Sequence, residues 1–345
     1  MIPFVNLQRE YFLNKVEIDS AIGNCLNNAE YLIPNTRLEN QLSEYANAEC
    51  AVVDSGTSAL VYALIASGIK PNDQVITVSH TYLATVEAIK AVGAIPIFVD
   101  VDDNFLIDLS KVSISHQTKA ILYVDLYGQR PNVYQLRQLA DQHNLILIED
   151  AAQSFGCGDM NIADYTCTSF NPLKNLGGLG KGGAVFGKCV SDIRQIADHG
   201  RINSSVYRQG FNGRMDSVQA NVLSAKLPNL DSVIARKQEI AEYYDDQLKE
   251  CVIVPKRMEY SKHTYYVYCI RVKNRDSFRK KMHELGVETK LHYPNPVHKE
   301  PYFSDGSILP KTEKLSLDIV SLPCYNSLKD SEMKKVVESV WQSVS

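Results

Sequence analysis

The sequence predicts an α/β fold in which helices cover both faces of a large, mostly parallel sheet. From residue 51 onward, short runs of β-branched residues alternate with stretches in which apolar residues recur at helical spacing. This alternation is typical of parallel strands that are connected by helices. The chain has 345 residues, 45% of them hydrophobic, which is enough for one large domain and a smaller one.

Residues 1–48 are predicted to be helical after a short extended start. Apolar residues recur at helical spacing from Val16 onward and again after a break at Pro34-Asn35. In the alternating part, strands are predicted at residues 51–53, 74–78, 95–99, 120–124 and 145–148. The helices predicted between them cover residues 58–67, 84–92 and 133–143.

The second half of the chain is predicted to be richer in helices. Ile234, Ile240 and Leu248 mark apolar positions of a long charged helix that follows Gln219. A strand is predicted at residues 265–272, and helices are predicted at residues 276–285, 313–319 and 331–344.

The bulk composition restricts the class of protein. A formal net charge of −4 and a pI near 6.1 argue against nucleic acid as the main partner. No apolar run approaches the ~20 residues that span a membrane, and the N-terminus lacks a basic segment followed by a long apolar one. The eight cysteines are scattered without a Cys-x-x-Cys pair, which predicts reduced thiols and no metal site. We therefore expect a soluble cytoplasmic protein.

Lys174 is the first candidate functional residue. It lies between a β-prone run that ends at Ser169-Phe170 and a glycine-rich turn that precedes residues 184–186. A lysine in this position can attack a carbonyl group if burial or a neighbouring cation deprotonates its amine. An isolated loop lysine is more often simply solvated, so the functional interpretation depends on the rest of the chain.

A second candidate follows the first predicted strand, where Gly56-Thr57-Ser58 opens an apolar helix. Free backbone N–H groups, two hydroxyls and the positive end of the helix dipole would together bind a phosphate there. The same residues also fit an ordinary helix N-cap, which is the commoner use of such a turn.

Two more strand ends carry candidate residues. Tyr82 follows the strand at 74–78, where its ring could cover a flat cofactor or pack as an ordinary aromatic side chain. Asp150 follows the strand at 145–148 and precedes small residues. A carboxylate that leaves a buried strand is costly unless it meets a cation, such as a protonated pyridine nitrogen. A helix N-cap is the alternative role for this aspartate.

Six motifs, taken in order, resemble those of one family. They are Ser-Gly-Thr-Ser-Ala-Leu at 55–60, Thr-Tyr-Leu-Ala-Thr at 81–85, Leu-Tyr-Gly-Gln at 126–129, Glu-Asp-Ala-Ala-Gln at 149–153, Ser-Phe-Asn-Pro-Leu-Lys at 169–174 and Gly-Phe-Asn-Gly-Arg-Met-Asp-Ser-Val-Gln-Ala at 210–220. Six motifs at family-like spacing are far more specific than any one of them. From Ile2 to about Val340 the chain resembles the DegT/DnrJ/EryC1/StrS family of sugar aminotransferases, which have fold type I and depend on pyridoxal phosphate.

The resemblance implies a binding site for pyridoxal 5′-phosphate. Lys174 would form the Schiff base to the cofactor, and Asp150 would pair with the pyridinium nitrogen so that the ring acts as an electron sink. Tyr82 would stack on the ring, and Gln153 would reach its 3′-oxygen. The resemblance also implies a large cofactor-binding domain at residues 1–225 and a smaller α+β domain at 226–345.

By the same resemblance, Gly56, Thr57, Ser58 and Ser169 would hold the cofactor phosphate. Asn212 would complete this phosphate site from the neighbouring subunit. The active unit implied is therefore a homodimer with shared active sites.

Substrate contacts are predicted for Arg214 and for the segment at 292–298, His-Tyr-Pro-Asn-Pro-Val-His. Its two prolines fix the backbone, which suits a loop that presents polar side chains in one geometry. The candidates in this segment are His292, Tyr293 and His298, and a plain surface turn is the alternative interpretation.

Three departures from the family pattern concern the substrate side. The segment between Gln153 and Ser169 is shorter than usual, so a hairpin of many relatives is expected to be trimmed. Lys181 stands where relatives often carry an acidic residue, and Pro34-Asn35 replaces a glycine-rich turn.

The function implied is transfer of an amino group from glutamate to the keto group of a nucleotide-linked sugar. The His-Tyr-Pro-x-Pro sequence at 292–296 and the segment 163–186 resemble those of members that act on 3-keto sugars, bearing dTDP or UDP. In contrast, Ser-Gly-Thr-Ser at 55–58 resembles the sequence common among members that act on 4-keto sugars. A 4-keto nucleotide-sugar aminotransferase is therefore the alternative function. A sugar dehydratase of the same fold would carry histidine in place of Lys174, and a catalytically silent relative would have lost Asp150 or Lys174.

Overall fold

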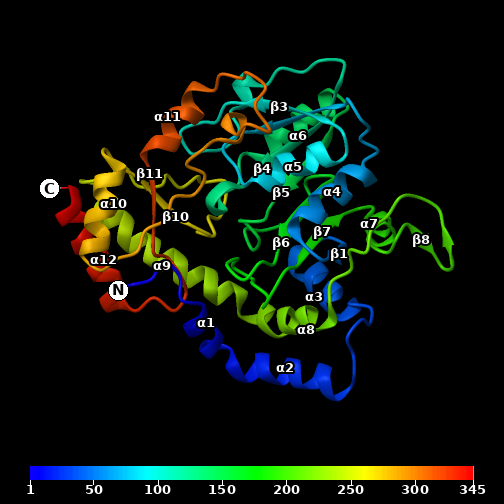
Figure 1. Cartoon of the computed structure of the whole chain (residues 1–345), viewed down its shortest axis with the longest axis horizontal. Helices are drawn as coiled ribbons and strands as arrows, with labels where there is room; N and C mark the ends of the chain where they lie inside the picture. The colour runs from blue at the N-terminus through cyan, green and yellow to red at the C-terminus, as the bar shows by residue number, and fades with distance from the viewer. Residues whose placement is uncertain (345) are drawn as a thin grey trace.

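The computed structural model describes residues 1–344 and has a mixed sheet at its centre (Figure 1). The strand order is β1-β7-β6-β5-β4-β2-β3; neighbours from β6 to β3 are parallel, whereas β7 is antiparallel to both β6 and β1. The strands are β1 (Cys50–Val53), β2 (Gln74–Val78), β3 (Ile95–Val99), β4 (Thr118–Val124), β5 (Ile146–Asp150), β6 (Tyr165–Ser169) and β7 (Gly183–Gly187). The predicted α/β fold is confirmed.

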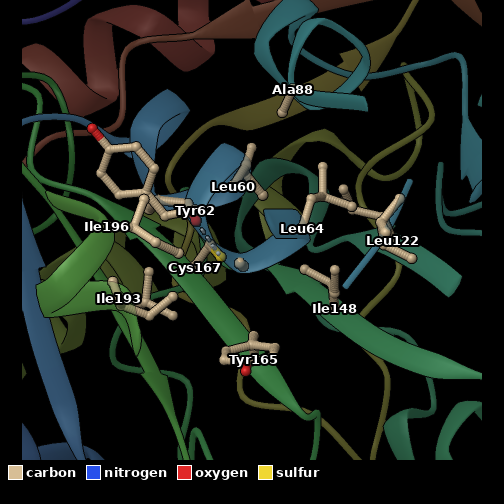
Figure 2. Close-up of a cluster of buried hydrophobic side chains, with 14 of the residues drawn as sticks. Leu60, Tyr62, Leu64, Ala88, Leu122, Ile148, Tyr165, Cys167, Ile193 and Ile196 are labelled. Atoms are coloured by element: carbon tan, nitrogen blue, oxygen red, sulfur yellow. Dashed lines mark hydrogen bonds between the residues drawn. The ribbon is translucent and has the colours of Figure 1, made fainter. Parts of the chain in front are cut away.

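Helices cover both faces of this sheet, because the side chains of each strand alternate between two apolar layers. Leu122 and Ile148 point to one face, where they pack with α4 and α7 (Figure 2). Ile121 and Leu147 point to the other face, where α6 covers them. The helices of this part are α4 (Gly56–Ala66), α5 (Leu83–Ala91), α6 (Val133–Gln142) and α7 (Val190–Ala197).

The N-terminal residues form helices, as the apolar spacing predicts. They are α1 (Leu7–Leu13), α2 (Lys15–Asn27) and α3 (Thr36–Ala46), and α3 packs beside α8 (Ser217–Lys226) against the β1–β7 end of the sheet. A hairpin of β8 (Arg201–Ile202) and β9 (Ser205–Val206), which was not predicted, projects from the body of the molecule (Figure 1).

The C-terminal part contains a second, two-stranded sheet of β10 (Tyr268–Arg271) and β11 (Ile319–Leu322). Its helices are α9 (Leu230–Leu248), α10 (Arg275–Glu284), α11 (Pro310–Asp318) and α12 (Asp330–Val344). Short 3₁₀ turns complete the chain at η1 (Leu109–Lys111), η2 (Leu126–Gly128), η3 (Leu227–Asn229) and η4 (Val297–Lys299).

Two predictions for this part need correction. The strand predicted at 265–272 begins only at Tyr268, and β11 was missed because its short apolar run cannot be told from a helix end by periodicity. The domain boundary at residues 225 and 226 stays a prediction. Ile2 forms a bridge with Val287, so the first residues of the chain pack against the C-terminal part.

The two edge strands of the central sheet are β1 and β3. At β1, the N–H of Val52 donates to the Glu39 carboxylate at 3.0 Å, and Arg194 donates to the Cys50 carbonyl at 2.7 Å. Glu39 and Arg194 also form an ion pair with each other at 3.0 Å. At the opposite edge, β3 contains Pro96.

Among residues 1–344, none of the helices is both long and apolar enough to span a lipid bilayer. Most of the cysteines are buried, and all of them are free thiols in the structure. Residues 154–164 form turns and bends without a strand, in agreement with the trimmed hairpin.

Candidate active site

A cavity of about 600 Å³ lies beyond the carboxyl ends of β5 and β6, beside the N-terminus of α4. This is where ligands bind in open α/β sheets. The cavity gathers most of the residues that the sequence predicts for the cofactor and one predicted for the substrate. They are Gly56, Thr57, Ser58, Tyr82, Asp150, Gln153, Ser169, Lys174 and Tyr293.

The N-terminus of α4 forms one end of the cavity. Ser55 is the N-cap and accepts a hydrogen bond from the Ser58 N–H at 3.1 Å. The first N–H groups of a helix have no intrahelical acceptor, which leaves those of Gly56 and Thr57 for a bound anion. A Cβ atom on Gly56 would lie 2.7 Å from the Ser169 Cβ, so only glycine lets α4 approach β6 this closely.

Asp150 ends β5 with its carboxylate buried in the cavity wall. Thr85 donates to one carboxylate oxygen at 2.8 Å, and the Ala152 N–H donates to the other at 3.2 Å. Burial raises the pKa of Asp150, whereas these hydrogen bonds and the positive charge of Lys174 oppose the rise. The site thus holds a desolvated carboxylate that would bind a cationic group of a ligand strongly.

Lys174 lies in the turn that follows β6, and its N–H donates to the Asn171 carbonyl at 2.8 Å. Its Nζ lies over the face of the Tyr266 ring, 4.2 Å from the ring centre. Burial lowers the pKa of Lys174 to about 8, although Asp150 pulls it in the opposite direction. Near neutral pH the site therefore holds a larger fraction of the neutral amine, which attack on a carbonyl group requires, than a solvated lysine would.

Tyr293 and Gln153 form a second wall of the cavity. The Gln153 amide donates to the Tyr293 hydroxyl at 2.9 Å, and its carbonyl accepts from the Tyr127 N–H at 2.8 Å. The second N–H of this amide is left for a ligand oxygen. Tyr293 has a left-handed backbone with φ of 64°, and its ring stacks on Tyr127. Tyr82, by contrast, leaves 59% of its surface exposed at the rim.

His292 lies next to this wall but does not line the cavity. Its Nδ1 is 2.8 Å from the Ser321 Oγ. Burial and the nearby charge of Lys174 lower the pKa of His292 to about 4, so the imidazole is neutral near pH 7.

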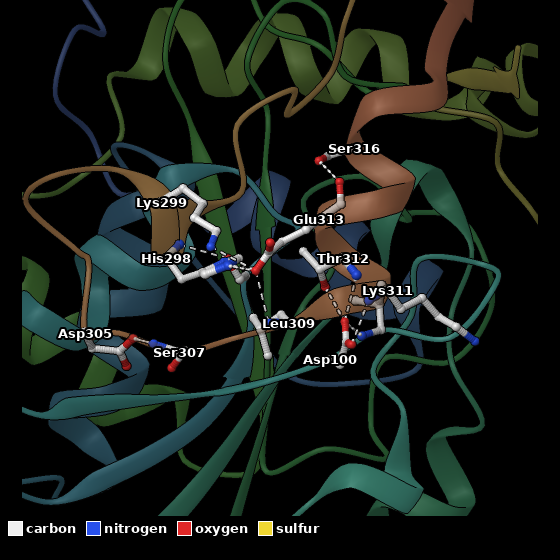
Figure 3. Close-up of polar contacts among 12 residues, drawn as sticks. Asp100, His298, Lys299, Asp305, Ser307, Leu309, Lys311, Thr312, Glu313 and Ser316 are labelled. Atoms are coloured by element: carbon white, nitrogen blue, oxygen red, sulfur yellow. Dashed lines mark hydrogen bonds and ion pairs between the residues drawn. The ribbon is translucent and has the colours of Figure 1, made fainter. Parts of the chain in front are cut away.

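His298 does not line the cavity. Figure 3 shows its ring directed at Glu313 of α11. His298 is only 1% exposed, and its two ring nitrogens are occupied by Ser79 at 2.6 Å and by Glu313 at 3.2 Å. His298 lies in η4, and its two ring nitrogens tie this turn to Ser79, just after β2, and to Glu313 of α11. His298 is therefore not among the substrate contacts that we propose.

Asn212 and Arg214 lie on the surface and do not line the cavity of their own chain. Arg214 faces Asp198 at 3.7 Å. The segment that carries both residues leads away from the projecting β8–β9 hairpin toward α8.

Sequence reasoning missed three residues of the cavity region. Thr85, which holds Asp150, was part of a recognised motif, but a spacing pattern does not show which carboxylate it meets. Tyr266 was assigned to a strand that in fact begins two residues later. Lys181 lines the cavity as a further lysine, and its sequence signal was the departure from an acidic residue.

These residues fit pyridoxal phosphate in charge and shape. The free N–H groups and the hydroxyls at the N-terminus of α4 suit its phosphate, and the buried Asp150 carboxylate suits a protonated ring nitrogen. Lys174, which lines the same cavity, suits its aldehyde.

Fold and site together define a pyridoxal phosphate-dependent aminotransferase of fold type I. The chain belongs to the DegT/DnrJ/EryC1/StrS aminotransferase family, whose model matches residues 17–341. It is a sugar aminotransferase.

Several relatives are named for sugars that carry a nucleotide. The chain is 36% identical to the UDP-2-acetamido-2-deoxy-3-oxo-D-glucuronate aminotransferase of Pseudomonas aeruginosa, over 97% of this chain and 98% of that protein. It is also 36% identical to the dTDP-3-amino-3,4,6-trideoxy-alpha-D-glucose transaminase of Micromonospora megalomicea, over 91% of each. The crystal structure of NtdA from Bacillus subtilis with bound cofactor PMP is similar with a TM-score of 0.94, at 30% identity, over 99% of this chain and 85% of that one.

In cofactor-free protein, acetylation of Lys174 by acetic anhydride should rise with pH and reach half its maximum at about 8. Only the neutral amine reacts, so the labelled fraction is small below this pH and complete above it. Mass spectrometry of the peptide gives the profile. In denaturant the midpoint should move to ~10.4, and equal midpoints in the folded and unfolded chains would contradict the perturbed amine.

Proposed function

We propose that this enzyme transfers the amino group of glutamate to C3 of a nucleotide-linked 3-keto sugar. The observation that carries the aminotransferase chemistry is the placement of Lys174 and Asp150 in one cavity. The choice of C3 is supported by two relatives, each named for a nitrogen or a keto group at position 3 of the sugar. The resemblance of residues 292–296 to those of 3-keto members supports the same position.

When bound, pyridoxal phosphate supplies an electron sink that stabilises negative charge at the reacting substrate carbon. In this proposal Asp150 keeps the ring nitrogen protonated, and Gly56, Thr57, Ser58 and Ser169 hold the phosphate. Lys174 moves a proton at the substrate carbon, because its amine is neutral in part near pH 7 to 8.

The loop at 292–296 would set the position of the sugar ring. Tyr293 lines the cavity, and its side chain is held by a hydrogen bond from the Gln153 amide and by stacking on the Tyr127 ring. Moving the acceptor carbon by one position requires the ring to turn, and a rigid hydrogen-bonding group can favour one orientation. His292 anchors this loop to β11 through its hydrogen bond with the Ser321 hydroxyl.

The rival within the same class is a 4-keto sugar aminotransferase, which the Ser-Gly-Thr-Ser sequence at 55–58 favours. The dehydratase alternative is opposed by Lys174, which occupies the position where a dehydratase would carry histidine. The silent alternative is opposed by the presence of both Lys174 and Asp150 in the cavity.

Matched 3-keto and 4-keto nucleotide sugars, supplied with ¹⁵N-labelled glutamate, test the proposal. We expect kcat/KM to be at least ~10-fold higher for the 3-keto sugar, with the label at C3 by NMR. The UDP and dTDP forms should be compared in parallel. A clear preference for the 4-keto sugar would overturn the C3 proposal and leave the aminotransferase class intact.

We further propose a homodimer in which Asn212 and Arg214 reach the cavity of the partner. Both side chains are exposed in the single chain, and neither lines its own cavity. Exposed apolar side chains lie on the neighbouring hairpin segment, at Ile202, Val206 and Tyr207. Such a patch is expected at a surface that another chain covers.

Mixing an inactive Lys174→Ala chain with an Asn212→Ala chain should restore activity. Each mixed dimer would contain one intact site, so an equal mixture should reach roughly a quarter of wild-type turnover after subunit exchange. The test requires that Asn212→Ala alone be severely impaired. A chain with both substitutions, mixed with Lys174→Ala, is the control and should stay inactive. No recovery, or a monomer by light scattering, would count against the shared site.

A further inference from the structure

Lys237 is a buried lysine in the core-facing stripe of α9. The stripe continues through Ile234, Ala241, Tyr244 and Leu248, and Lys237 is only 6% exposed within it. No carboxylate of residues 1–344 forms an ion pair with its amine. A buried amine without a counter-ion is destabilising, so a specific role is expected for it.

The amine of Lys237 is directed at the turn that carries Lys174. Its Nζ donates to the Asn175 side-chain carbonyl at 2.8 Å. The Asn175 amide in turn donates to the backbone carbonyl of Thr264 at 3.4 Å, and the Thr264 hydroxyl donates to the backbone carbonyl of Gln153 at 3.0 Å. Hydrogen bonds thus connect α9 to the cavity wall at Gln153 through Asn175, the residue after Lys174.

A second lysine anchors the same turn from α8, because the Lys226 amine donates to the Gly177 carbonyl. Lys174, Lys226 and Lys237 all line a small cavity of about 60 Å³ behind the turn. Glu10 lines it too, but its carboxylate is engaged by the backbone and hydroxyl of Ser327 at 2.9 and 2.7 Å. Positive charge therefore predominates on this side of Lys174.

We propose that Lys237 is a positioning residue for Lys174: it holds the Lys174 turn through Asn175, and its positive charge disfavours protonation of the Lys174 amine. The proposal rests on Lys174 being the reactive amine of the proposed function. A neighbouring cation is one of the ways in which proteins keep a lysine nucleophilic.

The other groups that face Lys174 are Asp150 from β5, Tyr266 before β10 and His292 from the substrate loop. Asp150 favours the protonated amine, whereas Lys237 and burial oppose it. Tyr266 and His292 are neutral near pH 7, because burial raises the pKa of the phenol and lowers that of the imidazole.

Lys237 itself is close to Glu10 from α1 and to the Cys324 thiol, which donates to the Lys237 backbone carbonyl at 3.7 Å. Burial lowers the pKa of Lys237, and both neighbours oppose this effect. Lys237 is also hydrogen-bonded to Asn175, the residue that directly follows Lys174 in the chain.

The acetylation profile of Lys174 in cofactor-free protein tests the charge effect. Lys237→Met fills the same space without charge and should raise the midpoint by roughly half a pH unit or more. Lys237→Gln keeps a donor for Asn175 and should give the same rise, whereas Lys237→Arg should leave the midpoint unchanged. Lys249→Met, at an exposed position just after α9, is the matched control. Unchanged midpoints in both neutral variants would overturn the charge effect.

Asn175→Ala tests the positioning effect, because it removes the anchor of Lys237 without removing the lysine or any other charged side chain. We expect a midpoint like that of the parent protein and a kcat at least ~10-fold lower in the holoenzyme, with little change in KM. Wild-type kcat in this variant would overturn the positioning role. Since the labelling uses no sugar, failure of the C3 proposal would leave the charge result standing.

Discussion

Replacing Lys174 by alanine should lower turnover by at least ~1,000-fold and leave the fold largely unchanged. Covalent attachment and proton transfer both depend on this amine, which the turn after β6 holds against Tyr266. Cofactor binding should persist in weaker form, because the N-terminus of α4 and Asp150 supply separate contacts. The measurements are kcat with glutamate and a keto sugar, and the absorbance of retained cofactor after gel filtration.

Lys188→Ala is the matched control for this substitution. Lys188 is exposed beyond β7 and lies outside the cavity, so its loss should not change kcat. Activity of Lys174→Ala within about tenfold of wild type would remove Lys174 from the proposed chemistry.

Asp150→Asn should lower kcat by roughly 100- to 1,000-fold, with no loss of thermal stability in the cofactor-free protein. The amide keeps the shape and its oxygen can still accept from Thr85, although the bond from the Ala152 N–H is lost, and it cannot stabilise a positive charge on the bound ring. Removing a buried carboxylate also relieves the desolvation that raises the pKa of Asp150. Activity loss and unfolding are therefore expected to separate in this variant.

The measurement pairs steady-state kinetics with thermal unfolding of the cofactor-free chain. Thr85→Val, which removes the hydrogen bonds of the Thr85 hydroxyl to Asp150 and Thr81 but keeps the carboxylate, should give a smaller loss of activity. Asp141→Asn, on the exposed surface, should match wild type in both assays. Near-normal turnover in Asp150→Asn would show that the carboxylate is not needed.

Much of the fold could be predicted from the sequence, because the signals are local. The β-branched runs at β2, β4 and β5 lie in the apolar sheet core, and Asp150 and Lys174 follow strand ends where such sheets bind ligands. The family resemblance then implied that Gly56 and Ser169 belong to the same site, and their close contact across α4 and β6 explains the glycine.

The remaining features depend on contacts between distant parts of the chain. His298 looked available in a loop sequence, but Ser79 and Glu313 occupy its nitrogens only after the loop docks on the sheet. Lys237 falls at an apolar position of α9, which marks it as unusual, yet its partner Asn175 is 62 residues away. No local pattern shows such a partner.

The two edges of the central sheet affect how chains can associate. An exposed strand edge invites pairing with another chain and is a common start of aggregation. At β1 the side chains of Glu39 and Arg194 already take the outward N–H and carbonyl groups. At β3 the N–H of Ile95 points inward to Asp73, so strand alternation turns Pro96 outward, where it has no hydrogen to donate.

Extension of the sheet from one chain into the next is therefore disfavoured at both ends. The proposed dimer would have to form by side-chain packing on another surface, such as the apolar side chains at 202–207. This arrangement separates productive assembly from aggregation, because the two processes would use different faces of the molecule.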